Sequence, residues 1–172
     1  MKNVLLSLFI LMSLTSCVEV LFEQAQPAGV KAKRQFPTSL RGMYITDEKD
    51  TMLIAQYEIK EMSGKQEPDM ILSSDLVLKK YKKYYYLNLR NEDGLWEVGV
   101  ISVGKDGNLN ISYIDGSKKE KLQRLKQLVK TTTILNDEEK EDYYVIDPSK
   151  KELMKLLKDD IFEKFGEFRK IE

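Results

Sequence analysis

Short alternating segments separated by tight turns fill the middle of the chain, and they constrain its fold more than any other feature. In 84–90, for example, Tyr85, Leu87 and Leu89 share one face, while Tyr84 and Tyr86 share the other. The turn signals are Asn91–Gly94, Lys105–Asn108 and Asp115–Gly116. Asp-Gly suits a type I′ turn because glycine tolerates positive φ. Parallel crossovers need a dozen or more residues, so these short connections predict an antiparallel meander.

Further strands are expected on both sides of this meander. They cover residues 40–45, 52–59, 76–78, 131–134, 143–146 and 165–171. Residues 118–130 and 149–162 show helical spacing instead. Ser149 and Glu152 form a capping box at the start of the second helix. The predicted fold class is α+β, mainly β, with a curved sheet or small barrel and two helices in the C-terminal half.

The chain has no histidine, one cysteine and equal numbers of basic and acidic residues. These counts exclude histidine-dependent triads, Cys-x-x-Cys metal sites and internal disulfides. We expect no metal and no cofactor. The zero net charge argues against nucleic acid as a partner, because nucleic-acid-binding proteins normally carry a basic excess.

The N-terminus has the organisation of an export signal. Met1-Lys2-Asn3 is a short positive start, and the apolar run 4–12 is too short to span a bilayer, which needs about 20 helical residues. Leu14-Thr15-Ser16-Cys17 follows and resembles the lipobox of bacterial lipoproteins. The alternatives are an ordinary signal peptide with a chance cysteine and a signal-anchor helix.

This resemblance implies diacylglyceryl transfer to Cys17, cleavage after Ser16 and further acylation, with palmitate as an expected acyl group. Residues 1–16 would then be the signal peptide. Two or three acyl chains give stable membrane anchoring. The residue after the cysteine is Val18. In lipoproteins of Gram-negative bacteria, an Asp at this position retains the protein in the inner membrane. The resemblance therefore favours the outer membrane of a Gram-negative bacterium.

Residues 17–35 are interpreted as the lipidated N-terminus followed by a flexible tether, because Gln24–Gly29 contains Pro and Gly without sustained periodicity. Residues 36–172 are then expected to form a single globular domain. Its length is sufficient for a packed core without disulfides.

Few side chains point to a binding or catalytic site. Tyr84, Tyr86 and Trp96 are candidates for ligand contact, since aromatic rings stack on sugars, although packing within the sheet explains them more simply. The carboxylates are mostly in turns or beside lysines, so no catalytic residue is assigned. The basic run Lys79–Lys83 is interpreted as a solvated strand edge.

Leu40-Arg41-Gly42-Met43-Tyr44 is similar to the Gly-x-Trp start of lipocalin-like barrels, with Tyr44 at the Trp position. Our main hypothesis is a non-catalytic envelope lipoprotein that serves as a binding or accessory module, with an envelope protein or a glycan as its partner. The alternatives are a lipocalin-like carrier of a small apolar ligand and a small carboxylate-dependent hydrolase.

Overall fold

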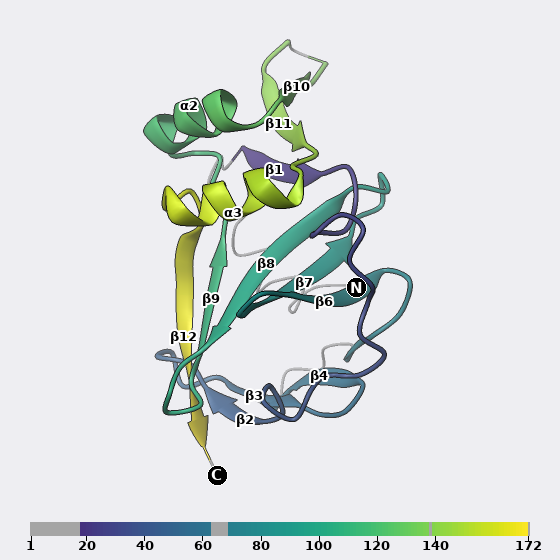
Figure 1. Cartoon of the computed structure of the whole chain (residues 1–172), viewed down its shortest axis with the longest axis vertical. Coiled ribbons are helices and arrows are strands. Elements are labelled where there is room, and N and C mark those ends of the chain that lie inside the picture. Colours follow the sequence, from purple (N-terminus) through teal and green to yellow (C-terminus); the bar gives the residue numbers. More distant parts are fainter. Residues whose placement is uncertain (1–17, 63–68, 138, 172) are drawn as a thin grey trace.

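The computed structural model describes residues 18–62, 69–137 and 139–171. The predicted signal peptide and Cys17 therefore lie outside the described residues. Within the described residues, no helix has the length and apolar character needed to span a membrane. Figure 1 shows one strongly curved sheet with both helices at one end of the molecule.

The predicted fold class is confirmed: the described part of the chain is mainly β, with two helices in its C-terminal half. Two antiparallel meanders dominate the sheet. The first contains β2 (Gly42–Ile45), β3 (Thr51–Ile54), β4 (Glu58–Glu61) and β5 (Met70–Ile71). The second contains β6 (Leu76–Tyr81), β7 (Tyr84–Arg90), β8 (Trp96–Val103) and β9 (Leu109–Tyr113).

The strand expected over residues 52–59 is in fact a hairpin. β3 ends at Ile54 and β4 begins at Glu58, so the apolar run turns back on itself at Ala55–Tyr57. The backbone amide of Ala55 donates to the carbonyl oxygen of Glu58 at 2.9 Å and closes the turn.

The last strand joins the two meanders. β12 (Glu163–Ile171) pairs first with β9 and then, over its final residues, with β2. At the other end, β1 (Glu19–Phe22) lies parallel to β11 (Glu141–Ile146), and β10 (Thr131–Leu135) pairs with β11. The result is one mixed, open and curved sheet of twelve strands among the described residues, rather than a closed barrel.

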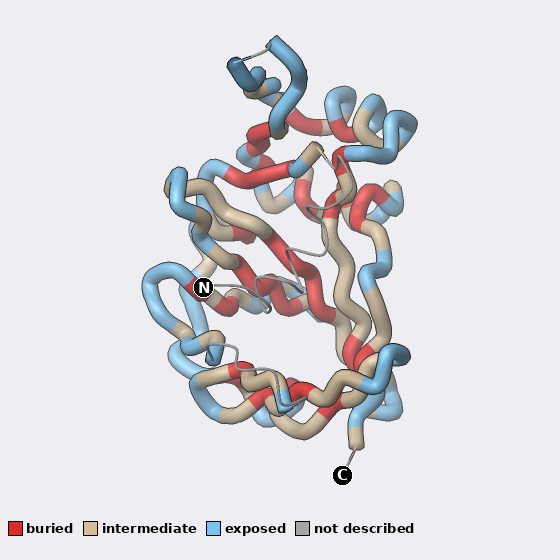
Figure 2. The backbone as a smooth tube through the Cα atoms, turned by 180° about the vertical axis from the view of Figure 1, so that it is seen from behind, coloured by how far each residue is buried: buried red, intermediate tan, exposed pale blue. Residues whose placement is uncertain are grey.

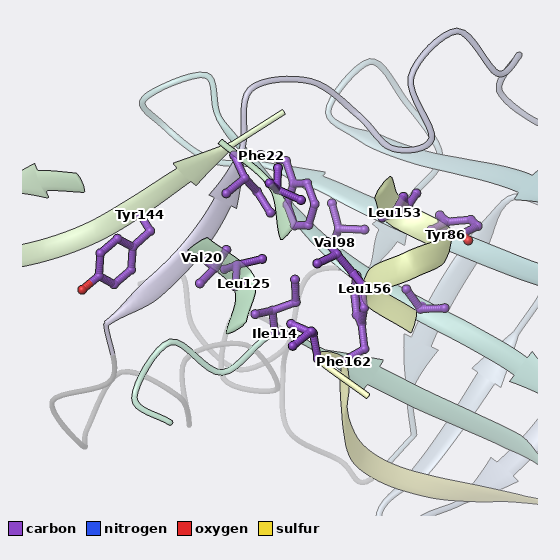
Figure 3. Close-up of a cluster of buried hydrophobic side chains, with 14 residues drawn as sticks. Val20, Phe22, Tyr86, Val98, Ile114, Leu125, Tyr144, Leu153, Leu156 and Phe162 are labelled. Carbon is purple, nitrogen blue, oxygen red and sulfur yellow. The ribbon is translucent and has the colours of Figure 1, made fainter. Parts of the chain in front are cut away.

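The strands β7 and β8 separate two hydrophobic cores, because neighbouring side chains on a strand point to opposite faces. Tyr86, Val98 and Val100 contribute to one core, which the helices α2 (Lys119–Leu128) and α3 (Lys150–Lys158) cover. Figure 3 shows this core at close range, and Figure 2 shows buried residues along the strands on both sides. Tyr85 and Leu87 point into the second core, on the concave side of the sheet.

The helices bury the stripes that their sequences predict. Leu125 of α2 and Leu153 and Leu156 of α3 are fully buried. The predicted capping box at the start of α3 is confirmed: Ser149 Oγ accepts from the Glu152 amide, and the Glu152 carboxylate accepts from the Ser149 amide. Helix α3 is therefore held at a defined starting point over β7.

The predicted flexible tether over residues 17–35 is wrong for the described part of that range. Residues 19–22 form the buried strand β1 in the middle of the sheet. After β1 the chain runs along the outside of β6, where the Lys33 amide donates to the Leu78 carbonyl at 2.8 Å. The segment has no apolar periodicity because polar groups, rather than an apolar face, attach much of it to the domain.

Asn88 provides the main attachment. Its fully buried side chain accepts a hydrogen bond from the Gln26 amide and donates to the Gln26 carbonyl at 3.0 Å. The same amide group also donates to the carbonyls of Val77 and Tyr86, both at 3.1 Å. One side chain therefore ties the N-terminal segment to β6 and β7.

Replacing Asn88 with alanine should destabilise the fold strongly. The substitution leaves the buried Gln26 amide without its partner and removes the hydrogen bonds that Asn88 donates, and each unsatisfied buried polar group costs about 1–3 kcal/mol. We expect the free energy of unfolding to fall by about 3 kcal/mol or more in a denaturant titration.

Asn110→Ala is the matched control, because its side chain makes no hydrogen bond among the described residues. It should change the free energy of unfolding by no more than about 0.5 kcal/mol. Equal losses in the two variants would show that Asn88 is not a special attachment.

Candidate functional site

The aromatic side chains proposed for ligand contact do not form an exposed platform. Tyr86 is completely buried, and its hydroxyl lies 3.9 Å from the sulfur of Met154 on α3. Burial, with smaller effects from Tyr84 and Tyr81, raises the pKa of the Tyr86 hydroxyl above its usual value. Tyr86 therefore belongs to the core, and its assignment to a ligand surface is wrong.

Tyr84 and Trp96 are half-buried at the edge of the same core. The Lys83 ammonium lies 5.2 Å from the centre of the Tyr84 ring, and the Arg90 guanidinium lies 5.9 Å from that of Trp96. Both distances are within the range of a cation–π interaction. Tyr81, the cross-strand partner of Tyr84, is half-buried too. The hairpin between β6 and β7 therefore presents two partly exposed tyrosines.

The most perturbed acid is Glu97 on β8. Burial, together with the nearby charge of Glu19, raises its pKa from 4.5 to about 7. The pKa of Glu19 is also raised, mainly by burial and in addition by Asp142. No group of acidic or cysteine side chains in the described residues has the arrangement of a metal site. Glu19 therefore lies near two other carboxylates, those of Glu97 and Asp142.

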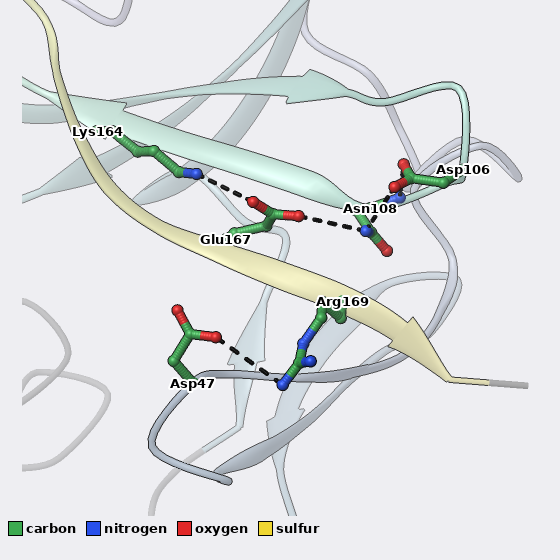
Figure 4. A network of polar contacts seen from close by, with 6 residues as sticks. All are labelled: Asp47, Asp106, Asn108, Lys164, Glu167 and Arg169. Carbon is green, nitrogen blue, oxygen red and sulfur yellow. Dashed lines mark hydrogen bonds and ion pairs between the residues drawn. The ribbon is translucent and has the colours of Figure 1, made fainter.

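A second polar cluster lies on β12, far from these carboxylates in the sequence (Figure 4). The Asn108 amide donates to Asp106 at 2.7 Å and to Glu167 at 3.3 Å, and its oxygen accepts from the Lys170 amide at 2.9 Å. Lys164 in turn pairs with Glu167 at 3.0 Å.

This cluster brings two carboxylates to one amide group, and a pair of acids is what a glycoside hydrolase needs. Asp106 and Glu167 are, however, both committed to Asn108, and the contact between Asp106 and Asn108 is exposed. The arrangement fastens the turn between β8 and β9 to β12. We therefore assign it a structural role.

The concave core bears on the lipocalin-like hypothesis. Tyr44 is fully buried there, and its hydroxyl donates to the Leu40 carbonyl at 2.9 Å. Gly42 has φ +145°, and a Cβ at this position would meet the Lys170 side chain at 2.7 Å. Phe36 and Leu40, from the segment before β2, also lie fully buried in this core. The chain places its own side chains where a carrier would hold its ligand.

Basic side chains gather where three distant segments meet. The Lys79 ammonium on β6 donates to the carbonyls of Ala25 and Pro27, at 2.6 and 3.2 Å. On the other side of this segment, the Lys150 ammonium lies 3.9 Å from the position that a Cβ at Gly29 would take. We define the basic surface by the cations of these segments: Lys31, Lys33, Arg34, Lys79, Lys82, Lys83, Lys150 and Lys151.

Most members of the basic surface are exposed; Lys79 and Lys150 are partly buried. None of the eight forms an ion pair with an acidic group of the described residues. Two acids lie nearby: Asp147 accepts from Gln24, and Glu152 caps α3. The cations of this surface outnumber these two acids, and none of them is ion-paired with either one.

No protein-family model matches this chain, and neither the curated proteins nor the solved structures give a significant match. The candidate sites therefore depend on geometry and charge alone. Of the features described above, the basic surface is the one that leaves its charges free to meet a partner.

The raised pKa of Glu97 predicts how stability depends on pH. The folded protein holds this proton up to about pH 7, whereas the unfolded chain releases it near 4.5. Protonation therefore favours folding, and the contribution of Glu97 to stability is lost as the pH rises through about 7. Glu97→Gln should remove this loss and be more stable than the natural protein at pH 8, by roughly 1–3 kcal/mol.

Denaturant titrations at pH 5 and pH 8 test this expectation. Glu120→Gln, at an exposed position on α2, is the control and should keep the natural pH dependence. If Glu97→Gln also keeps it, Glu97 does not hold a proton in the folded state.

Proposed function

We propose that this protein is a bacterial envelope lipoprotein, anchored through acyl chains on Cys17, that acts as a non-catalytic binding module. The observation that carries the proposal is the sequence Leu14-Thr15-Ser16-Cys17 behind a short apolar run. Val18 after the cysteine favours the outer membrane. No other cysteine is present to compete for modification.

The start of the folded domain supports this position for the anchor. β1 begins at Glu19, two residues after Cys17. Val18 is packed closely, since a Cβ at Gly116 would collide with its carbonyl oxygen. Processing after Ser16 would remove the residues that precede the domain and spare β1. The acylated residue would then be joined directly to the sheet. This short connection would hold the domain at the membrane surface.

The described residues support binding more than catalysis or transport. Asp106 and Glu167 are held in a structural cluster, and no histidine is available as a general base. Phe36 and Leu40 pack into the concave core where an apolar ligand would otherwise lie. The basic surface, in contrast, presents unpaired cations to the solvent. An envelope protein or a glycan is the expected kind of partner.

Replacing Cys17 with alanine tests the anchor. In a Gram-negative host, the variant should carry no acyl chains and should remain uncleaved, because the thiolate is the group that is alkylated. Intact-mass spectrometry of the membrane fraction reads both changes. Ser7→Ala, within the apolar run, is the control and should be processed and acylated normally. A Cys17→Ala protein that is still processed and membrane-bound would contradict the proposal.

A further inference from the structure

We propose that the basic surface binds an acidic polysaccharide, a chain of sugar rings bearing carboxylate or sulfate groups. This inference deepens the proposed binding role and rests on it, but it does not depend on the lipid anchor. It specifies a partner class and the residues that meet it, on a different part of the molecule from the anchor.

The first argument is the separation of charge along the chain. Residues 24–36, 76–83 and 149–158 contain three, four and four basic residues, and Glu152 is their single acid. The whole protein nevertheless has no net charge. The fold brings these segments together, because Lys33 bonds to the β6 backbone and Lys79 to the backbone of residues 25 and 27. Figure 1 shows the N-terminal segment passing β6 on one side of the molecule.

The second argument is unrelieved repulsion at the centre of this surface. Lys79 and Lys150 flank the same stretch, residues 25–29. Burial and the neighbouring Lys150 charge lower the pKa of the Lys79 ammonium. The groups that receive its hydrogen bonds are neutral carbonyls, which do not cancel its charge. An anion placed beside these two ammonium groups would remove the repulsion.

The shape of the surface indicates an extended partner rather than a single small anion. Its cations come from an exposed segment, a hairpin tip and the start of a helix, so they do not converge on one point. Tyr81 and Tyr84 stand at the hairpin beside Lys82 and Lys83. Partly exposed aromatic rings can stack against sugar rings, while the flanking cations pair with acidic substituents.

A membrane surface fits this position less well. The anchor would enter at the start of β1, where Glu19 bridges to Asp115 and lies near Asp142. The basic surface begins beyond the opposite end of β1, after Phe22. Lipids at the anchor would therefore meet the start of β1 rather than the basic surface.

The test measures binding of the mature acylated protein, in neutral detergent micelles, to immobilised heparin, a sulfated uronic-acid polysaccharide. The surface variant replaces Lys33, Lys83 and Lys151 with glutamine, one exposed lysine from each segment. We expect its dissociation constant to rise about tenfold or more, because the variant loses three cations that would pair with acidic groups of the polysaccharide. Binding should also weaken as salt increases.

The matched control replaces Lys105, Lys118 and Lys130, three exposed lysines outside the basic surface, and changes the net charge equally. It should bind heparin within about twofold of the natural protein, since distant exposed charges are screened. Equal weakening in both variants, or no heparin binding by the natural protein, overturns the proposal.

Anionic lipid is the remaining alternative and is tested in the same assay. Adding phosphatidylglycerol to the micelles should leave heparin binding largely unchanged. If the lipid abolishes binding while a neutral lipid does not, the surface prefers lipid headgroups and the proposal is overturned. The mass of the same protein sample reports acylation separately, so a failure of the anchor is not confused with a failure of glycan binding.

Discussion

The hydrogen bonds between Asn88 and Gln26 are the interaction on which the rest of the structure depends. They join a segment without apolar periodicity to the middle of the sheet, using both the amide and the carbonyl of Gln26. A buried amide side chain that satisfies several backbone groups is costly to remove, and it therefore defines one position for the segment. β1 is then held between β8 and β11, and residues 24–36 are held beside β6.

Two functional consequences follow from this attachment. The proposed lipidated residue, Cys17, would be joined almost directly to a buried strand, so the orientation of the domain on the membrane is restricted. The same segment also carries Lys31, Lys33 and Arg34 to the side of β6, where they meet the hairpin lysines and the start of α3. One attachment therefore places the proposed anchor at one end of β1 and the basic surface beyond the other end.

Local signals in the sequence predicted most of the fold. Turn residues such as Asp106-Gly107 and the capping box at Ser149 act through neighbouring backbone groups, so they can be read without knowledge of the tertiary structure. The attachment of Gln26 could not be predicted, because its partner lies 62 residues away. Net charge also does not report where charges gather, since it averages over residues that the fold places on different parts of the surface. The burial of Tyr86 could not be predicted either. The alternation of side chains along β7 divides them between two faces of the sheet, but it does not show that helix α3 covers the face that carries Tyr86.

Amide hydrogen exchange of the Gln26 backbone tests the central claim most directly. This amide donates to Asn88 in the fully buried part of the domain. If the N-terminal segment is part of the fold, its exchange should be slowed to nearly the same extent as that of the β7 amides, because it opens with the sheet. Exchange of Gln26 at the rate of an unfolded chain, alongside protected β7 amides, would show that residues 24–36 are a tether after all.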